Sequence, residues 1–396
     1  SSSNLLIIWI LTINFFLFMK KRILLLSVFA LAIASCSKND DKPSPDVPNP
    51  NEKPQPESVS EGGVFKPSVG GPNEPNQVFI DLSTKKESTA KRDSWDFGFY
   101  CGDDFRVILN STVKMAAKQL ETTNIDEVQA EDPSVSVGFN TFANLGYVDS
   151  PWGELKSAQN TKGRQTAIAE VSASEADNKV YLVNMGFAVG TTPPEKGAVK
   201  LDGDARGWKK VRITRSGNDY VIHYANLNDT THKSITVKKD PAYNFVFVSL
   251  NQEKIVNVQP EKTKWDISFT GLTNYTAMGP GKEITYYFAD MVINNLYGGV
   301  RVHKVIATEA NKRDAEYEAF NKSKANEIDF NDSKLAHQLG IGSSWRKAGP
   351  QGTVVSDNVF YIIKDANGNL YKLKFLAITN DNGERGYPVF EYALLK

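Results

Sequence analysis

Cysteine and histidine are scarce in this chain, with 2 Cys and 4 His among 396 residues. One cysteine, Cys36, closes an export signal described below, so Cys101 is the only cysteine in the rest of the chain. A single cysteine can form neither an intramolecular disulfide nor a cysteine-based metal site. The histidines show no H-x-x-x-H or H-E-x-x-H spacing, which argues against a zinc enzyme.

Catalytic and nucleic-acid-binding patterns are missing as well. The chain has no G-x-S-x-G motif, and the Gly-Pro-Gly-Lys stretch at residues 279–282 lacks the Walker spacing and a following Ser or Thr. Positive and negative side chains balance, with 46 Lys plus Arg against 46 Asp plus Glu, and there is no basic stripe. We therefore expect neither an enzyme nor a protein whose main partner is a nucleic acid.

The N-terminal region is typical of a secreted and lipidated protein. A basic stretch, Met19-Lys20-Lys21-Arg22, precedes an apolar stretch at residues 23–34 that is too short to span a membrane. The stretch ends in Ile33-Ala34-Ser35-Cys36, which resembles a bacterial lipoprotein cleavage site. Residues 19–36 are therefore predicted to be a lipoprotein signal peptide, with Cys36 carrying the lipid anchor. The alternative is an ordinary signal peptide with an incidental cysteine.

Two further segments flank this signal. Residues 1–18 are apolar and contain no initiator Met, so we expect upstream translation there; the alternative is a transmembrane segment. Residues 37–75 are rich in proline and polar residues, which predicts a semi-stiff linker without a core. Its start, Ser37-Lys38-Asn39-Asp40-Asp41, resembles the acidic export tag of surface lipoproteins in Bacteroidetes-type bacteria. We therefore expect a lipid-anchored outer-membrane protein exposed on the cell surface.

The remaining chain contains an internal repeat. Trp95-Asp96-Phe97-Gly98-Phe99 recurs as Trp265-Asp266-Ile267-Ser268-Phe269, and each copy follows a similar apolar strand, at residues 76–82 and 244–250. Further matches follow downstream in the same order. The spacing is about one domain length, which favours a tandem duplication over a solenoid. We predict one domain at 76–241, a second at 242–396, and independent folding of the second.

Strand patterns dominate both copies, because apolar and polar residues alternate as in half-buried strands. Hairpin turns are predicted at residues 216–219 and 365–369. Helical composition is confined to residues 112–120, 308–320 and 332–339. The sequence therefore predicts an all-β, mainly antiparallel fold with a few short helices. We expect strands at 78–82, 95–100, 105–109, 180–187, 209–214, 220–226, 245–250, 265–270, 286–293, 299–306, 359–364, 370–378 and 389–394.

The repeated Trp-Asp pairs have a predicted structural role. Trp95 and Trp265 start alternating strands, and an aromatic residue there normally packs inward. Asp96 and Asp266 follow on the opposite face, where we expect them to hydrogen bond to the backbone of a neighbouring loop.

Three features together suggest a family. A W-D-x-x-F strand follows an F-x-L strand twice, Phe105-Arg106-Val107-Ile108-Leu109 leads into Asn110-Ser111, and the tail contains Asp357-Asn358-Val359-Phe360-Tyr361-Ile362-Ile363. This pattern resembles the HmuY family of haem-binding lipoproteins across both repeats. The resemblance implies two tandem HmuY-like β domains. It also implies uptake of haem, free or from a haemoprotein, and its transfer to a TonB-dependent outer-membrane receptor.

One departure from the family concerns the iron ligands. In the best-known members two histidines hold the haem iron, and one of them lies a few residues after a Trp. Here that place reads Trp345-Arg346-Lys347-Ala348-Gly349-Pro350, and the equivalent residues 166–175 of the first repeat also lack histidine. Some relatives use Met instead, and a thioether is a competent axial ligand.

The candidate haem residues are therefore taken from the second repeat. The ligand candidates are His337, Met278, Met291 and His303, each of which has an ordinary structural alternative as a surface or core residue. Arg346 and Lys347 are candidates for binding the propionates. The resulting hypothesis is a non-enzymatic surface lipoprotein that binds haem or a related porphyrin. The alternative is a binding or adhesion module that keeps the fold without binding haem.

Overall fold

A computed structural model describes residues 58–138, 145–196, 198, 200–350 and 352–396. The upstream segment, the signal peptide with Cys36 and the linker up to residue 57 lie outside the described residues. Within the described ranges the chain forms mainly antiparallel sheets with few helices, so the predicted fold class is confirmed.

One set of sheets is formed entirely by residues 93–258, which we call the inserted unit. Its strands are β4 (Phe97–Tyr100), β5 (Val107–Leu109), β6 (Ala116–Gln119), β7 (Val180–Asn184), β8 (Phe187–Val189), β9 (Asp202–Ala205), β10 (Trp208–Ser216), β11 (Asp219–Asn226), β12 (Lys233–Val237), β13 (Phe245–Ser249) and β14 (Lys254–Val256). They form a five-stranded sheet in the order β12-β11-β10-β7-β6, a four-stranded sheet in the order β14-β13-β4-β5, and the pair β8-β9.

A second set is formed by residues 58–92 together with 259–396, which we call the split unit. Its strands are β1 (Gly62–Phe65), β2 (Asn76–Asp81), β3 (Lys86–Lys91), β15 (Ile267–Ala277), β16 (Glu283–Asn294), β17 (Arg301–Ile306), β18 (Arg346–Gly349), β19 (Gly352–Val355), β20 (Val359–Lys364), β21 (Leu370–Thr379) and β22 (Arg385–Leu394). They form a five-stranded sheet in the order β1-β22-β21-β20-β17, a four-stranded sheet in the order β16-β15-β2-β3, and the pair β18-β19. The α-helices are α2 (Arg313–Ala319) and α3 (Lys322–Ala325).

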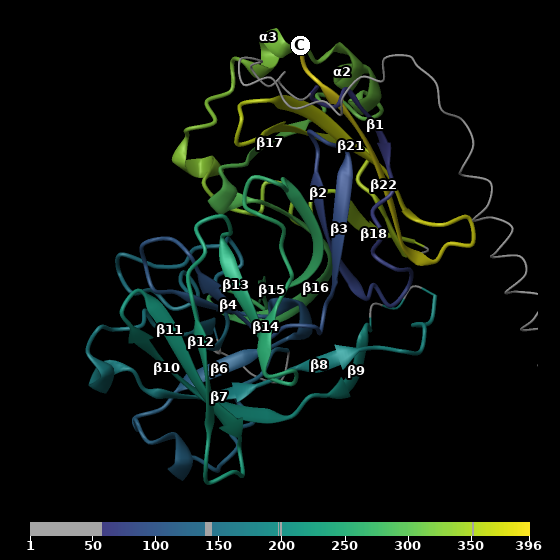
Figure 1. Cartoon of the computed structure of the whole chain (residues 1–396). Helices are drawn as coiled ribbons and strands as arrows, with labels where there is room; N and C mark the ends of the chain where they lie inside the picture. The colour runs from purple at the N-terminus through teal and green to yellow at the C-terminus, as the bar shows by residue number, and fades with distance from the viewer. Residues whose placement is uncertain (1–57, 139–144, 197, 199, 351) are drawn as a thin grey trace, which may run out of the picture. The chain divides into compact units, whose positions relative to one another are not determined.

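The two units share one topology in a permuted order. In the inserted unit the Trp-Asp strand β4 comes first and the hairpin β13–β14 last; in the split unit the equivalent hairpin β2–β3 precedes its Trp-Asp strand β15. β13 pairs with β4 and β2 pairs with β15, both antiparallel. Figure 1 shows the purple β1 next to the yellow β22, from the opposite end of the chain. The sequence repeat therefore begins one hairpin earlier than the structural unit.

The Trp-Asp pairs connect these strands by matched hydrogen bonds. The Asp96 carboxylate accepts from the backbone N–H of Leu250 at 2.6 Å, and the Asp266 carboxylate accepts from that of Leu82 at 2.7 Å. Each carboxylate thereby holds the residue that follows the paired apolar strand, as predicted. The environments differ, because Asp96 also pairs with Arg206 at 2.5 Å, whereas burial raises the pKa of Asp266 to about 8.

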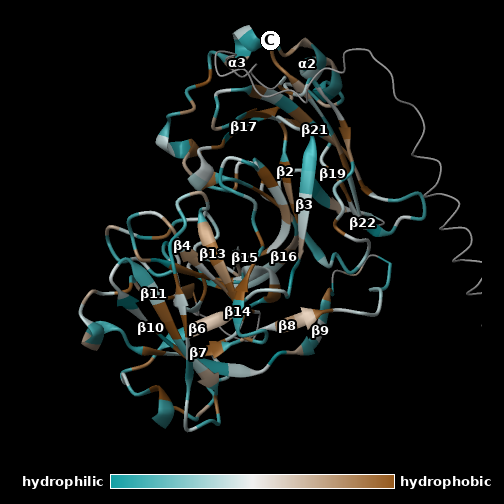
Figure 2. Cartoon of the chain, in the orientation of Figure 1, coloured by the Kyte–Doolittle hydropathy of each residue, from teal (hydrophilic) through white to brown (hydrophobic). Residues whose placement is uncertain are grey.

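Each unit has its own hydrophobic core, and a third cluster lies between them. The core of the inserted unit draws only on residues between Phe97 and Leu250, whereas that of the split unit combines Val78 and Ile80 of β2 with residues of the C-terminal strands. The third cluster contains Trp95 and Trp265, the tryptophans of the two Trp-Asp pairs, which are 5% and 4% exposed, so their predicted burial is confirmed. Figure 2 shows the contrast between the hydrophilic outer strand β3 and the hydrophobic residues of the neighbouring β2.

The structure begins earlier than the predicted boundary at residue 76. Within the predicted linker, β1 forms a sheet edge with Gly62 opposite Ala393. Val59, Phe65 and Val69 pack against the core of the split unit. A few apolar residues among the prolines are enough to complete this edge, because the sheet already supplies the apolar surface that they cover.

Two helix predictions are wrong. Within residues 112–120, Ser111–Val113 is a 3-10 turn, and Ala116–Gln119 is the strand β6, because pairing with β7 outweighs helix propensity. Within residues 332–339 only the 3-10 turn Ser333–Leu335 forms. The helix predicted within 308–320 and both hairpin turns are confirmed. The other 3-10 turns are Ile125–Glu127, Leu145–Tyr147, Glu175–Asp177 and Leu296–Gly298.

The permuted order changes the expectation for isolated fragments. Residues 93–258 contain the whole core of the inserted unit, so this fragment should give a β-type circular dichroism spectrum and a cooperative urea transition. Residues 242–396 lack β1–β3 and carry β13–β14 without its partner β4, so they should be largely unfolded. A cooperative transition in the second fragment and none in the first would contradict this topology.

The two Asp carboxylates should differ in stability measurements. Asp96→Asn leaves Arg206 buried without its carboxylate and should cost about 3–5 kcal/mol in the free energy of unfolding. Asp266→Asn keeps an acceptor for Leu82 without a buried charge, so its cost should be smaller.

The pH dependence provides the control for this comparison. The pKa of Asp266 is raised from 3.8 to about 8 on folding, so between these values the folded protein holds a proton that the unfolded chain has lost. The wild-type free energy of unfolding should therefore fall as the pH rises through this window. Asn cannot ionise, so Asp266→Asn should become more stable relative to wild type from pH 5 to pH 8, as measured by urea unfolding. A pH-independent difference would contradict the assignment.

Candidate functional site

His337 lies in the irregular segment between α3 and β18, and its ring is already engaged. Nδ1 accepts from the backbone N–H of Leu339 at 3.0 Å, and the backbone of Lys334 also hydrogen bonds to the ring. Burial lowers the pKa of His337. The imidazole is therefore neutral, but its ring already hydrogen bonds to the backbone of two nearby residues in this conformation.

His303 has a different environment. It lies on β17, an edge strand, opposite Ile362 of β20, and it is half-buried. Among the described residues it has no hydrogen-bond partner, and burial lowers its pKa. A neutral imidazole without a partner keeps a nitrogen lone pair for a metal.

The two predicted methionines also differ. Met278 follows β15 at the turn of the β15–β16 hairpin and is 47% exposed, so its thioether is accessible. Met291 lies on β16 and is 1% exposed, which makes it a core residue. The hairpin end that carries Met278 contacts the inserted unit, where the Tyr275 hydroxyl donates to the Gly163 carbonyl at 2.9 Å.

The predicted propionate residues are occupied by protein groups. The Arg346 guanidinium donates to the carbonyls of Asp290, at 3.0 Å, and Ala289. Lys347 is exposed and pairs with Asp357 at 3.0 Å. The structure thus does not gather the predicted residues into one site: His303 and Met278 are accessible, whereas His337, Met291 and Arg346 have contacts within the fold.

A pocket that the sequence did not reveal lies at one end of β17 and β20. Its volume is about 380 Å³, and its walls include Arg301, Phe330 and Lys364. Arg301 stands directly opposite Lys364 across the two strands, and neither forms an ion pair with a described residue. One guanidinium nitrogen of Arg301, Nη1, donates to the carbonyls of Leu296 at 3.0 Å and Val300 at 2.9 Å. Like charges in this position repel. Arg301 and His303 are two residues apart on one strand, so both point to the same sheet face.

The sequence contains only part of the information that identifies this pocket. The basic residues were visible in the sequence, but their pairing depends on the register of β17 against β20. Phe330 comes from the segment between α3 and β18, and the Lys364 ammonium lies 5.8 Å from the centre of its ring. Asp365 also lines the pocket, but its carboxylate accepts from the backbone N–H groups of Asn367 and Asn369 in the hairpin turn.

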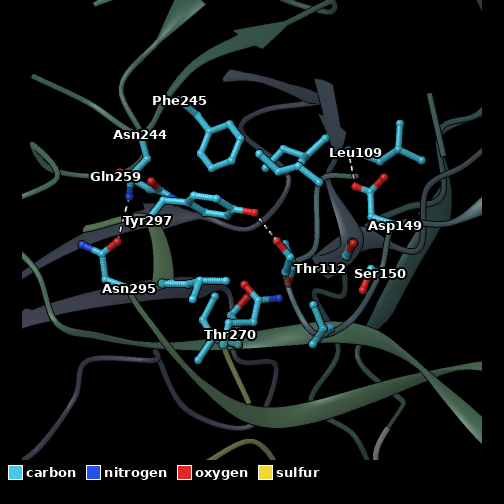
Figure 3. Close-up of a pocket in the computed structure, with 18 of the residues that line it drawn as sticks. Leu109, Thr112, Asp149, Ser150, Asn244, Phe245, Gln259, Thr270, Asn295 and Tyr297 are labelled. Atoms are coloured by element: carbon cyan, nitrogen blue, oxygen red, sulfur yellow. Dashed lines mark hydrogen bonds between the residues drawn. The ribbon is translucent and has the colours of Figure 1, made fainter. Parts of the chain in front are cut away.

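A second pocket, the interface pocket, is shared by the inserted and split units. Its volume is about 110 Å³. Figure 3 shows Tyr297, Phe245 and the amide side chains of Asn244 and Asn295 around it, with Asp149 on another side. The lining residues are Gln77, Trp95, Ile108, Leu109, Ser111, Thr112, Asp149, Ser150, Gly153, Glu154, Leu155, Thr166, Asn244, Phe245, Gln259, Trp265, Thr270, Gly271, Leu272, Ile293, Asn294, Asn295, Leu296, Tyr297 and Gln338.

The interface pocket is unsuited to haem. None of its lining residues is Lys, Arg, His or Met, so it offers no cation for a propionate and no His or Met ligand for iron. Its acidic members are Asp149 and Glu154. Burial raises the pKa of Asp149 to about 7, and its carboxylate accepts from the N–H groups of Leu109 and Ala167. The volume is also below the 150 Å³ of an engineered protein cavity that holds benzene.

The inserted unit contains a histidine pair that the sequence did not predict. The ring centres of His223 and His232 are 5.6 Å apart, and His232 Nδ1 lies 2.8 Å from the Asp126 carboxylate. His223 is half-buried. Among the described residues no group of three or more His, Cys, Asp or Glu side chains is arranged to hold a metal ion. A membrane-crossing helix is likewise not found in the described ranges.

These features describe a protein built from two related antiparallel β units. A family model described as HmuY protein matches residues 73–232 and again 242–392. The chain therefore belongs to the HmuY family, in two tandem copies, and this is a family of binding proteins rather than enzymes. No curated protein matches the chain.

Solved structures show related chains at low identity. One is described as a HmuY-like heme binding protein from Bacteroides vulgatus (13% identity, covering 47% of this chain and 91% of that chain, TM-score 0.20). Another is a lipoprotein from Bacteroides fragilis (12%, 46% and 93%, TM-score 0.20). A third, apo PinO from Porphyromonas gingivitis, covers 85% of this chain and 99% of its own at 12% identity and a TM-score of 0.22. At these TM-scores the likenesses carry no argument about the site.

Proposed function

We propose that this protein binds haem or a related porphyrin at the pocket beside His303. The observation that carries the proposal is the facing pair Arg301 and Lys364 on the same strands as an unpartnered neutral histidine. Membership of the HmuY family supports haem as the ligand class. The pocket volume of about 380 Å³ lies within the usual range for small-molecule sites.

His303 does not line the pocket itself but lies two residues from Arg301 on β17, and together with the lining residues it offers a group for each part of the ligand. The neutral His303 imidazole would hold the iron through a ring nitrogen. Arg301 and Lys364 would bind the propionates, and the anions would relieve the repulsion between the two cations. Phe330 supplies an aromatic surface for the macrocycle. A second protein ligand, Met278 or His337, would require rearrangement of the loop that carries it.

The cellular setting is part of the same proposal. Lipidation at Cys36 and the proline-rich linker would hold the folded units at the outer-membrane surface. There the protein would take haem, free or from a haemoprotein, and deliver it to a TonB-dependent receptor. This role in iron acquisition is supported by the family and by the signal sequence.

A binding or adhesion module without haem is the second candidate function. It is favoured by the use of His337 and Arg346 in hydrogen bonds within the fold and by the burial of Met291. It also agrees with an interface pocket that has no cation among its lining residues.

A titration with ferric haemin followed at the Soret band separates the two functions. Wild type should sharpen and shift the band, and His303→Ala should weaken affinity at least tenfold because it removes the iron ligand. Lys364→Ala should weaken it several-fold, and esterified haemin should lose that dependence. His232→Ala is the matched histidine control and Lys347→Ala the matched lysine control, and both should bind as wild type. No Soret change with wild type would support the second function. If Met278→Ala abolished haem binding and His303→Ala did not, the haem site would lie at Met278 rather than beside His303.

The anchor is tested separately. Cys36→Ala should release the protein from the membrane fraction into the soluble fraction, since the lipid attaches to that thiol. The measurement is fractionation followed by detection of the protein, with wild type as the control. Full retention of Cys36→Ala would assign the anchoring to residues 1–18 instead.

A further inference from the structure

Two histidines of the inserted unit lie close together on one face of its five-stranded sheet. His223 belongs to β11, and His232 immediately precedes β12. Figure 1 shows these two strands side by side. The register sets His223 opposite Ser234, and His232 comes two residues before Ser234, so the two histidine side chains are diagonal neighbours. Their rings are nearly perpendicular, at an angle of 76°, and the ring centres are 5.6 Å apart.

This separation is that of two imidazoles on one metal ion. A Zn–N bond is about 2.0–2.1 Å long, and a ring nitrogen lies roughly 1 Å from the ring centre, so the ion lies about 3 Å from each centre. At bond angles between tetrahedral and linear, the two centres are then roughly 5–6.5 Å apart. The observed separation of 5.6 Å lies within this range. The backbone therefore already places the two rings at the separation that a shared ion needs.

Each ring also has a side chain that orients it. His232 Nδ1 lies 2.8 Å from the Asp126 carboxylate, and His223 Nε2 lies 3.3 Å from the Thr214 hydroxyl. Metal-binding histidines usually donate their other ring N–H to such a group, which fixes the tautomer and the direction of the ring. Because a carboxylate can only accept, it holds the proton of His232 on Nδ1. This leaves Nε2 of His232 and Nδ1 of His223 as the nitrogens for an ion.

The histidine pair is accessible from solvent, and a carboxylate lies beside it. The side chains of His232 and Asp126 are 35% and 37% exposed, and His223 is half-buried. Burial lowers the pKa of His223, so its imidazole is neutral at neutral pH. Arg212 stands opposite His223 on β10, but its guanidinium donates to two backbone carbonyls, both at 2.7 Å. An ion can therefore reach the rings, and the charge of Asp126 offsets part of its own.

We propose that His223 and His232 bind a divalent transition-metal ion, with Cu²⁺ held more tightly than Zn²⁺. Imidazole suits copper, nickel and zinc, whereas Mg²⁺ and Ca²⁺ prefer oxygen ligands. Asp126 is a positioning residue, because it orients His232 and does not touch the ion. The described residues contain no group of three or more such ligands, so water or a group from another molecule would complete the coordination. This site belongs to the inserted unit and is independent of the pocket beside His303.

The test is a metal titration of the tag-free mature protein by calorimetry. Wild type should bind one Cu²⁺ tightly, Zn²⁺ at least tenfold more weakly, and Mg²⁺ not at all. His223→Ala and His232→Ala should each weaken Cu²⁺ binding at least tenfold, because a single histidine cannot chelate the ion. The double variant should bind Cu²⁺ about as weakly as either single variant. Both single variants should keep haemin binding, and His303→Ala should show the reverse pattern, so failure at one site is distinguishable from failure at the other.

Spectroscopy separates ligation from a structural effect of the substitutions. The electron paramagnetic resonance spectrum of Cu²⁺-loaded wild type should show coupling to two nitrogens, and that of each single variant should not. Asp126→Ala should weaken Cu²⁺ binding about tenfold. Asp126→Asn should recover part of this loss, because its amide oxygen still accepts from Nδ1 of His232. Thermal unfolding verifies that each variant is folded.

Four results would overturn the proposal. They are the absence of Cu²⁺ binding to wild type, equal binding of Mg²⁺, wild-type Cu²⁺ affinity in His223→Ala or His232→Ala, and loss of Cu²⁺ binding in His303→Ala. A spectrum of the wild-type complex without two coupled nitrogens would do the same.

Discussion

The structure depends on one repeated hydrogen bond, from a backbone N–H at the end of an apolar strand to the carboxylate of a Trp-Asp pair. Asp96 holds Leu250 in this way, and Asp266 holds Leu82. The tryptophan beside each carboxylate packs on the aromatic residue of the strand that is held, Trp95 on Phe247 and Trp265 on Phe79. Strand pairing, burial of an aromatic pair and a buried polar contact therefore coincide at the same two places. These places bring together the sheets that surround the interface pocket.

The strands and their buried faces could be predicted from the sequence, whereas the way they pair could not. Alternation of apolar and polar residues defines a strand locally, and the Trp-Asp motif marks an inward-facing residue. The two apolar strands, Val78-Phe79-Ile80 and Val246-Phe247-Val248, offer almost the same side chains to either Trp-Asp strand. Nothing local distinguishes the pairings, so the sequence repeat was taken as the unit and the permutation was missed.

The candidate sites were less predictable, because residue type says little about what a side chain contacts. His337 was a ligand candidate, yet its ring hydrogen bonds to the backbone of Leu339 and Lys334. Arg346 was a plausible partner for an anion, yet two backbone carbonyls hold its guanidinium. The facing positions of Arg301 and Lys364 could be recognised only from the register of β17 against β20. Similarly, Trp95 donates its indole N–H to Gln77, whereas the buried indole N–H of Trp265 has no hydrogen-bond partner among the described residues. The difference arises because Phe245 stands at the position on β13 that Gln77 has on β2.

The permuted order has a consequence for how the chain folds. β1 and β22 form one sheet edge, although residues 62 and 393 are separated by almost the whole chain. The inserted unit, which uses only nearby segments, can complete its core while the C-terminal strands are still being synthesised. The hairpin β2–β3 must wait for β15, and β1 must wait for β22, so closure of the split unit is a late step with high contact order. Until then the exposed edges of β1 and β2 are the segments most open to wrong pairing with other chains.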